Sequence, residues 1–475
     1  MGRKLGEDPT VDETKFSSKA PSGDEGDAGS RETSEGGLKY ELEDKPPLSI
    51  TLLLGFQNIV TSFGGIVAVP LILAGMAGFD ISNTAYLVSA ALLASGINSI
   101  IQSRGIGKKP FRVGSGLPTI MGTDFGFVAP ANTIINTMGG GMAAYYGASM
   151  LGAVLEIILS YFIKPLMKIF PQVVTGTVIT LIGVTLMPVA MDWIGGGQVG
   201  AIGYGSVRNI AIAMLVFFII LFFNRYGKGI LSSASVLIGI VAGYLICIPF
   251  GMVDFSQVAS APWIELPQIF RYGVNFDPKF VVPFIAGYLV TVIETVGVVQ
   301  VIGEVTHTKP TDEDIANGVR ADGFGSFISP ILGSGPVATF SQNAGLIPLT
   351  RCASRMVAIV AGALLIVISL FPKLATLVSI MPAPVLGGAG ILMFGTVASS
   401  GIQSLSQVKF NNRNMLIVAS AMAVGLGVTM RPELVANLPG IISSLFSSGI
   451  SAGTIVALVL NIILKEEPNE VVPIS

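Results

Sequence analysis

The sequence is poor in charged residues and in the side chains that enzymes use to bind metals or attack substrates. Charged residues make up 12% of the 475 positions, against about 25% in a soluble globular domain, which argues against an ordinary soluble enzyme. One histidine, His307, and two cysteines, Cys247 and Cys352, leave no basis for a histidine metal site, a Ser-His-Asp triad or a disulfide framework. We therefore expect no metal and no cofactor.

Net charge of either sign is also lacking. The 27 basic and 29 acidic residues leave a formal charge of −2, which gives no overall basic field, so we expect no nucleic-acid partner. Residues 1–47 are rich in Ser, Gly, Glu and Asp and contain no apolar run. This composition predicts a disordered tail, and the missing apolar run argues against a signal peptide.

The rest of the chain is dominated by apolar segments. A helix that crosses a bilayer needs about 20 mostly apolar residues, and the sequence predicts fourteen such segments. They lie at about 49–73, 82–102, 116–137, 141–163, 172–190, 207–223, 230–250, 280–303, 312–332, 336–350, 354–371, 376–399, 414–430 and 441–464. With this count, Lys and Arg are enriched in the loops placed in the cytoplasm. We therefore predict an all-α, multi-pass protein of the cell membrane, embedded in lipid, with both termini cytoplasmic.

Two glycine-rich segments resemble each other. Residues 114–128 read GSGLPTIMGTDFGFV and residues 333–347 read GSGPVATFSQNAGLI, which aligns Asp124 with Asn343. With seven spans in each half, the halves have opposite orientations, as in the inverted repeats of many transporters. We predict an extended stretch at 117–121 and another at 336–340, in segments three and ten, each followed by a half-helix whose amino end faces a shared cavity. The alternative is two glycine-rich helices in close packing.

Glu294 lies in the middle of the eighth segment. A carboxylate at the bilayer centre costs about 2.5 kcal/mol or more, so such a residue is functional by default. Glu294 is a candidate proton carrier and ligand, and a structural salt bridge is the alternative. Asp124 belongs either to the site or to an N-cap of the half-helix. The amides of Gln342 and Asn343 can pair with a planar heterocycle, or can serve only as caps.

Other polar residues lie within predicted spans. Gln57 and Asn58 in the first segment face the same cavity or bond neighbouring helices. Asp322 and Arg320 in the ninth segment either take part in coupling or lie on a partly hydrated helix. We expect Glu156 and Glu304, close to predicted membrane boundaries, to be solvated.

The decapeptide QNAGLIPLTR at 342–351 resembles the signature of the nucleobase–ascorbate transporter family, also called nucleobase:cation symporter-2. That signature is Gln, Glu or Pro, then Asn, any residue, Gly, four residues, Thr, and Arg, Lys or Gly. Its fixed positions are met by Gln342, Asn343, Gly345, Thr350 and Arg351. The stretches 40–48, 114–127, 170–183 and 319–326 also agree with the family.

The resemblance implies a division into a core domain and a gate domain. The core comprises spans 1–4 and 8–11, at 48–169 and 280–372, and the gate comprises residues 170–279 and 373–464, with a cytoplasmic tail at 465–475. The family's members often form homodimers and work by elevator-like alternating access, with uptake coupled to a cation, usually a proton.

The family pattern also assigns residues. Glu294 and Gln342 hold the base, Phe125 stacks on it or lends its backbone, and backbone near Ser341 completes the contact. Glutamine at the signature's first position is typical of members for xanthine or urate, and glutamate of members for uracil.

Three positions depart from that pattern. The family has Gln-His where this chain has Gln57-Asn58, an Asp or His where it has Val298, and a Ser where it has Asp124. Our hypothesis is that Asp124 replaces the acid missing at Val298, and with Glu294 and Asp322 it is a candidate for proton coupling. The sequence thus predicts a proton-coupled purine permease; a uracil permease, an anion transporter of related fold and a membrane-embedded enzyme remain rivals.

Overall fold

The computed structural model describes residues 37–446 and 448–464. Residues from Leu38 onward form one compact unit. The backbone nitrogens of Lys39 and Tyr40 donate to the carbonyl of Arg351 at 2.7 and 3.2 Å, and the nitrogen of Ala353 donates to the carbonyl of Tyr40 at 2.8 Å. The predicted tail of 1–47 therefore ends earlier, because these hydrogen bonds hold its last part to the fold. Residues 1–36 and the predicted tail at 465–475 lie outside the described residues.

The chain is mostly helical up to the long loop that follows α11. The elements in this part are α1 (Leu48–Met76), α2 (Ile81–Arg104), β1 (Met121–Thr123), the 3-10 helix η1 (Phe125–Phe127), α3 (Val128–Asn132), the π-helix η2 (Thr133–Thr137), α4 (Gly141–Ser160), α5 (Ile163–Ile169), α6 (Gln172–Thr185), α7 (Met187–Gly195), α8 (Val207–Tyr226), α9 (Ile230–Ser233), α10 (Ser235–Cys247) and α11 (Ser256–Ser260).

The second part repeats the pattern of helices interrupted by one short strand. Its elements are η3 (Pro278–Phe280), α12 (Val282–Val305), α13 (Asp312–Ile328), η4 (Ser329–Leu332), β2 (Val337–Thr339), η5 (Gln342–Gly345), α14 (Leu346–Thr350), α15 (Arg355–Ser369), α16 (Pro372–Ser379), α17 (Ala383–Ser406), α18 (Asn412–Met430), α19 (Glu433–Ala436), α20 (Gly440–Leu445) and α21 (Gly449–Ile463).

The long helices are membrane spans. Among the described residues, 8 helical segments are long and apolar enough to cross a bilayer, with α6 and α7 forming one of them, and the pair α15–α16, bent by 83°, brings the number to 9. The apolar helices α10 and α21 are shorter. The chain is thus a mostly helical, multi-pass membrane protein, as expected. The predicted twelfth segment, 376–399, is misplaced: α16 ends at Ser379 and α17 begins after Pro382, because residues that precede prolines avoid helical conformation.

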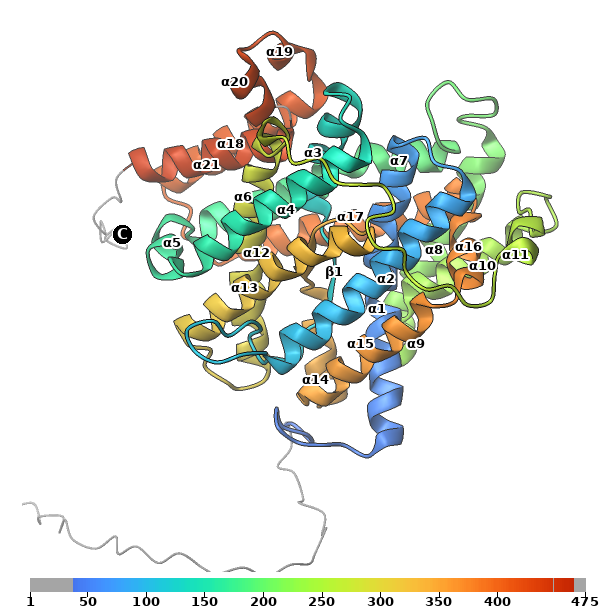
Figure 1. Cartoon of the computed structure of the whole chain (residues 1–475), viewed down its shortest axis with the longest axis horizontal. Coiled ribbons are helices and arrows are strands. Elements are labelled where there is room, and N and C mark those ends of the chain that lie inside the picture. The colour runs from blue at the N-terminus through green and yellow to red at the C-terminus, as the bar shows by residue number, and fades with distance from the viewer. Residues whose placement is uncertain (1–36, 447, 465–475) are drawn as a thin grey trace, which may run out of the picture. The chain divides into compact units, whose positions relative to one another are not determined.

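The third and tenth segments are the interrupted ones. β1 and β2 form an antiparallel two-stranded ribbon in which Met121 pairs with Thr339 and Thr123 with Val337. The ribbon contacts α1 and α2 through β1, and α12 and α13 through β2. Figure 1 shows β1 in the middle of these helices. The second strand lies within the predicted 336–340, but the first begins at Met121, at the end of the predicted 117–121. Hydroxyls of α2 hold that preceding stretch instead: Ser103 Oγ accepts from the nitrogen of Thr119 at 3.2 Å.

The helices pack in two groups. In the first group α15 packs against α1 and α2, and α13 packs against α4 and α12. In the second group α17 packs against α6, α7 and α8, α21 against α6 and α18, and α10 against α8. Fewer contacts join the groups, among them those of α12 with α6 and α21 and those of α1 with α10.

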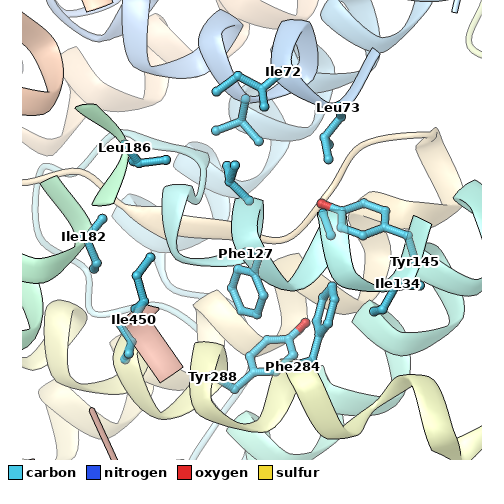
Figure 2. Packing of buried hydrophobic residues seen from close by; sticks show 14 of the residues in the cluster. Ile72, Leu73, Phe127, Ile134, Tyr145, Ile182, Leu186, Phe284, Tyr288 and Ile450 are labelled. Atoms are coloured by element: carbon cyan, nitrogen blue, oxygen red, sulfur yellow. The ribbon is translucent and has the colours of Figure 1, made fainter. Parts of the chain in front are cut away.

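An aromatic cluster fixes η1 against α12. The ring of Phe127 lies 4.9 Å from that of Phe284 and 4.7 Å from that of Tyr288, centroid to centroid. Tyr145 of α4 joins at 5.6 Å from Phe284, and Figure 2 shows these rings gathered between the helices. All four side chains are buried. Buried aromatic residues contribute large apolar areas, so the segment that follows β1 is held rigidly.

Candidate functional site

The amino ends of both half-helices lie next to the ribbon. η1 follows β1 after Asp124, and η5 follows β2 after Phe340 and Ser341. Because the strands are antiparallel, the two half-helices leave from opposite ends of the ribbon, with their amino ends nearest to it. The residue before η1 is Asp124 and the residue before η5 is Ser341. In the structure, the residue that corresponds to Asp124 is therefore Ser341 and not Asn343. The sequence alignment paired Asp124 with Asn343 because it ignores the different lengths of chain between each strand and its half-helix.

Asp124 caps the first half-helix and also contacts α12. It is buried, and its Oδ1 accepts from the backbone nitrogen of Gly126 at 2.7 Å. Its Oδ2 accepts from the Thr291 hydroxyl at 2.8 Å. The capping role considered from the sequence is therefore real. The contact with α12 lies one turn before Glu294, whereas Val298 lies one turn after it.

Asp322 is the centre of a buried hydrogen-bond network. Its Oδ1 accepts from Gln102 Nε2 at 3.1 Å and from the Thr339 hydroxyl at 2.9 Å. Its Oδ2 accepts from the hydroxyl of Thr295 and from the backbone nitrogen of Thr339, the latter at 3.3 Å. These donors come from α2, β2 and α12, so one carboxylate ties three elements together. Asp322 is 0% exposed, and the hydrated helix considered for this segment is excluded at this residue.

Glu294 lies on α12 between these two contacts. Thr291, three residues before it, bonds Asp124, and Thr295, directly after it, bonds Asp322. The side chain of Glu294 is half-buried. The structure records no ion pair for it within residues 37–446 and 448–464, so the salt bridge considered as its alternative role is not formed there. The carboxyl is therefore free to bind a ligand.

Ser341 and Gln342 present themselves at the amino end of η5. Both residues are exposed, and the Ser341 side chain makes no capping hydrogen bond. The amide of Gln342 reaches toward α1, where a Cβ added to Gly65 would lie 3.2 Å from Gln342 Nε2. An exposed amide carries a donor and an acceptor. Gln342 therefore has the chemistry to pair with a polar planar molecule.

Asn343, unlike Gln342, is buried and is hydrogen-bonded to α1. Its Nδ2 donates to the backbone carbonyl and to Oδ1 of Asn58, both at 3.0 Å, and Asn343 is buried. Gln57 donates through Nε2 to the Ser233 hydroxyl of α9 at 3.2 Å. Asn58 and Gln57, adjacent on α1, therefore bond different elements: Asn58 bonds η5 and Gln57 bonds α9. For Gln57 the structure shows the hydrogen bond between helices that was the alternative to a place in the cavity.

Phe125 joins the ribbon to α17. Its ring is half-buried and meets the ring of Phe394 edge to face, with centroids 5.5 Å apart. Phe125 directly follows Asp124, so the cap of the half-helix sets its position. One face of the site therefore carries an aromatic ring that touches the second group of helices.

The end of the signature motif shapes the chain after η5. Gly345 is exposed, and Thr350 donates to the carbonyl of Leu346 at 2.7 Å. Arg351 has φ 54°, a left-handed conformation that ends α14, and its carbonyl receives the hydrogen bonds from Lys39 and Tyr40. Thr350 and Arg351 therefore fix the end of α14, and they lie away from the exposed amino end of η5 at Ser341 and Gln342.

Sequence reasoning missed several residues of this region. Gln102, Thr295 and Thr339 surround Asp322, and a polar residue within a predicted span was the signal that could have pointed to Gln102. Glu156 is 0% exposed, so the expectation that it is solvated is wrong, because its side of α4 packs on α13. Glu304, at the end of α12, is exposed as expected.

Among the described residues no metal cluster lies at the site, and a cavity beside α2 and α16 lies away from it. Within the described ranges no group of three or more His, Cys, Asp or Glu could hold a metal ion. A cavity of about 240 Å³ lies between α2, the segment around Arg271 and α16, and is lined by Tyr86, Glu265 and Arg271. None of the candidate site residues lines it.

The chain matches a family described as the permease family over residues 49–434. It is 50% identical over 431 residues to a putative purine permease of Clostridium perfringens, covering 91% of this chain and 94% of that protein. It is 37% identical over 415 residues to the xanthine permease of Bacillus subtilis, covering 87% and 93%. It is 36% identical over 414 residues to the uric acid transporter UacT of Escherichia coli, covering 86% and 85%.

Solved structures of transporters share the fold. The transmembrane domain of the cyanobacterial bicarbonate transporter BicA superposes with a TM-score of 0.59 at 16% identity, covering 84% of this chain and 99% of that domain. SLC26A9 superposes with a TM-score of 0.61 at 12% identity, covering 87% of this chain and 65% of that one. Identities this low establish a common architecture and nothing about the substrate.

Proposed function

Because this chain belongs to the permease family of nucleobase:cation symporters, we propose that it carries an oxidised purine, xanthine or uric acid, across the cell membrane together with a proton. Membership of the family confirms the resemblance seen in the signature motif, and confirms that the protein is a transporter and not an enzyme. Both termini lie in the cytoplasm in this proposal, as the distribution of Lys and Arg indicates.

The observation that supports the substrate is an exposed amide and an acid without an ion-pair partner on two elements in contact, η5 and α12. Gln342 is exposed at the amino end of η5, and Glu294 lies on α12 between Thr291, which bonds Asp124, and Thr295, which bonds Asp322. A purine with several carbonyl and N–H groups needs donors and acceptors in one plane, which an amide and a carboxyl supply together. The relatives named above, a xanthine permease and a uric acid transporter, support the same class of substrate.

The proton travels with Glu294. A bare carboxylate inside the membrane is costly, and protonation or pairing with a ligand lowers that cost. Glu294 therefore crosses as the neutral acid or bound to the base, and releases the proton inside. Phe125 stacks on the base, and the backbone near Ser341 supplies a further contact.

The transport step is an elevator movement between the two groups of helices. The core consists of residues 48–169 and 280–372, and the gate of residues 170–279 and 373–464, with fourteen crossings in two inverted halves. The packing supports this division, since α1, α2, α4, α12, α13 and α15 pack mainly on one another, as do α6, α7, α8, α10, α17, α18 and α21. A homodimer of this chain is part of the proposal. The bond from Gln57 to Ser233 joins the two groups and must break when the core slides.

Purified protein in proteoliposomes tests this proposal. Radiolabelled xanthine should accumulate when the outside is more acidic than the inside, and uric acid should compete with it. Glu294→Gln should abolish accumulation, with Glu304→Gln as the matched control because Glu304 is exposed. Accumulation of uracil or bicarbonate in place of xanthine would assign the chain to one of the rival substrates, and xanthine accumulation that ignores the pH gradient would remove the proton from the mechanism.

A further inference from the structure

Glu156 is a buried acid for which the proposed mechanism has no use. It lies on α4 and is 0% exposed, and neither of its carboxylate oxygens has a hydrogen-bond partner among the described residues. An ionised carboxylate that is removed from water without a partner is strongly disfavoured. The surroundings therefore favour the neutral acid, which holds a proton.

Glu156 faces α13. On the same side of α4, Ser149 Oγ donates to the carbonyl of Ser326 at 3.0 Å, and Ser160 Oγ accepts from Arg320 Nε at 3.2 Å. Glu156 lies between these two contacts, one turn before Ser160. The helices are in backbone contact there, since a Cβ added to Gly323 would lie 3.0 Å from the backbone nitrogen of Ile157.

This position places Glu156 beside Asp322. Asp322 is adjacent in the chain to Gly323, which packs against Ile157, the residue that follows Glu156. Asp322 receives four hydrogen bonds, which suit an ionised carboxylate. Two acids close together in a low dielectric cannot both be ionised. The pair therefore shares one proton, which resides on Glu156.

Arg320 is the counter-charge within reach. It is buried, and within the described ranges it has no carboxylate partner. Its guanidinium donates to Ser160, to Asn317 and to the carbonyls of Pro110 and Arg112. One helical turn separates Ser160 from Glu156. A small shift of α13 along α4 would bring Arg320 to an ionised Glu156.

We propose that Glu156 is a second proton-binding residue of the transport core, which is neutral while Asp322 carries the charge and which releases its proton when it pairs with Arg320. The proton binds one carboxylate oxygen of Glu156 and leaves to water, and the carboxylate that remains is neutralised by the guanidinium. This inference rests on the proposed proton coupling and adds one proton to it.

Other charged and titratable groups on the elements around α4 are accounted for. They are Asp312, Glu313, Asp314, Arg320 and Asp322 of α13, Tyr288, Glu294 and Glu304 of α12, and Asp124 before η1. Two exposed ion pairs, Lys164 with Asp312 at 3.5 Å and Lys279 with Asp277 at 2.9 Å, involve α5 and η3, which also contact α4. Tyr288 donates to the carbonyl of Ser149 and does not compete for the Glu156 proton.

The test is the number of protons moved per xanthine. Wild type, Glu156→Gln and Glu304→Gln are reconstituted in proteoliposomes, and the ratio is obtained from the voltage at which net xanthine flux reverses under set gradients of pH and xanthine. We expect Glu156→Gln to move one proton fewer per xanthine than wild type, and Glu304→Gln to keep the wild-type ratio. An unchanged ratio in Glu156→Gln overturns the role of Glu156.

Infrared spectroscopy tests the same residue without changing it. In Glu294→Gln protein labelled with ¹³C-glutamate, we expect a band of protonated glutamic acid at neutral pH that fades as the pH rises. Absence of that band overturns the inference even if Glu156→Gln does not fold. Wild-type uptake that ignores the pH gradient would instead overturn the proposed proton coupling, whereas proton-driven uptake with an unchanged ratio overturns only the role of Glu156.

Discussion

η1 and η5 occupy equivalent places in the two halves of the chain, and their first residues are used in different ways. In the first half, Asp124 caps the helix and bonds Thr291, and Phe125 packs on Phe394. In the second half, Ser341 leaves the helix uncapped, and Ser341 and Gln342 are exposed. One copy of the repeat is therefore closed by the protein's own groups, and the other is open.

The difference explains how an inverted repeat can build an asymmetric site. A ligand site needs rigid walls and a few unpaired polar groups. The first half-helix is rigid, because Asp124 accepts a hydrogen bond from its amino end and Phe127 packs into the aromatic cluster. The second supplies the unpaired groups, and its position is fixed one residue further on, where Asn343 bonds Asn58. Substitutions of the exposed residues at η5 and of the capping residue at η1 test this difference between the two half-helices.

We expect the largest effect, a loss of xanthine transport, from Gln342→Ala. We expect it to lower kcat/KM for xanthine about 100-fold, because two hydrogen bonds to the base are lost and its polar groups are left unpaired. Proteoliposome uptake measures the change. Gln403→Ala is the matched control, since Gln403 is exposed on α17 and the proposed contact does not include it. Equal effects of the two substitutions would show that the open half-helix does not bind the base.

Asp124→Ala should act mainly on stability. It removes a cap and a hydrogen bond to a buried carboxylate, a loss of about 2 kcal/mol in the free energy of unfolding. Thr291 is not orphaned, since its hydroxyl also bonds the carbonyl of Gly287 at 3.0 Å. The melting temperature in detergent measures this loss.

Asp124→Asn separates the cap from the charge. The amide oxygen still accepts from Gly126, so stability should fall by less, while any part of Asp124 in proton coupling is lost. Proton-driven xanthine uptake that matches wild type would sink the hypothesis that Asp124 replaces the acid missing at Val298. Asp124 contacts Thr291, one turn before Glu294, whereas Val298 lies one turn after it, so this experiment is what decides the hypothesis.

The broken segments show what sequence could and could not predict. The matching glycine-rich stretches indicated two interruptions in spans, and β1 and β2 confirm an extended stretch in each. Their register could not be read from the sequence, because the helices start after turns of different length, and this paired Asp124 with Asn343 wrongly. Polarity inside a span identified Asp124, Glu294 and Asp322 as special residues.

The roles of other acids depend on what packs against them. Glu156 and Glu304 both lie near the end of an apolar segment, and the sequence predicted both to be solvated. The structure buries Glu156 under α13 and leaves Glu304 exposed. Distance from a predicted boundary gives the depth of a residue but not its face, and the face is set by contacts between helices far apart in the chain.

A smaller effect is expected from Asn343→Ala and Asn58→Ala. Asn343→Ala removes both hydrogen bonds that fix η5 on α1 and should lower the free energy of unfolding by about 1 kcal/mol. Asn58→Ala removes only the bond to Asn58 Oδ1, because the backbone carbonyl of residue 58 remains, and should cost about 0.5 kcal/mol. The double variant should cost little more than Asn343→Ala alone, because Asn58→Ala removes part of the same contact. Thermal unfolding of the four proteins gives the coupling energy. Additive losses would mean that this contact does not position the open half-helix.

The smallest effect is expected from Ser341→Ala. Ser341 is the counterpart of Asp124, but its hydroxyl makes no capping bond, so its removal should change the free energy of unfolding by less than about 0.5 kcal/mol. The melting temperatures of Ser341→Ala and Asp124→Ala, measured side by side, compare how much the residue before each half-helix contributes to stability. A loss for Ser341→Ala as large as that for Asp124→Ala would mean that both half-helices are capped in the membrane, and the asymmetry of the site would then have to come from Gln342 alone.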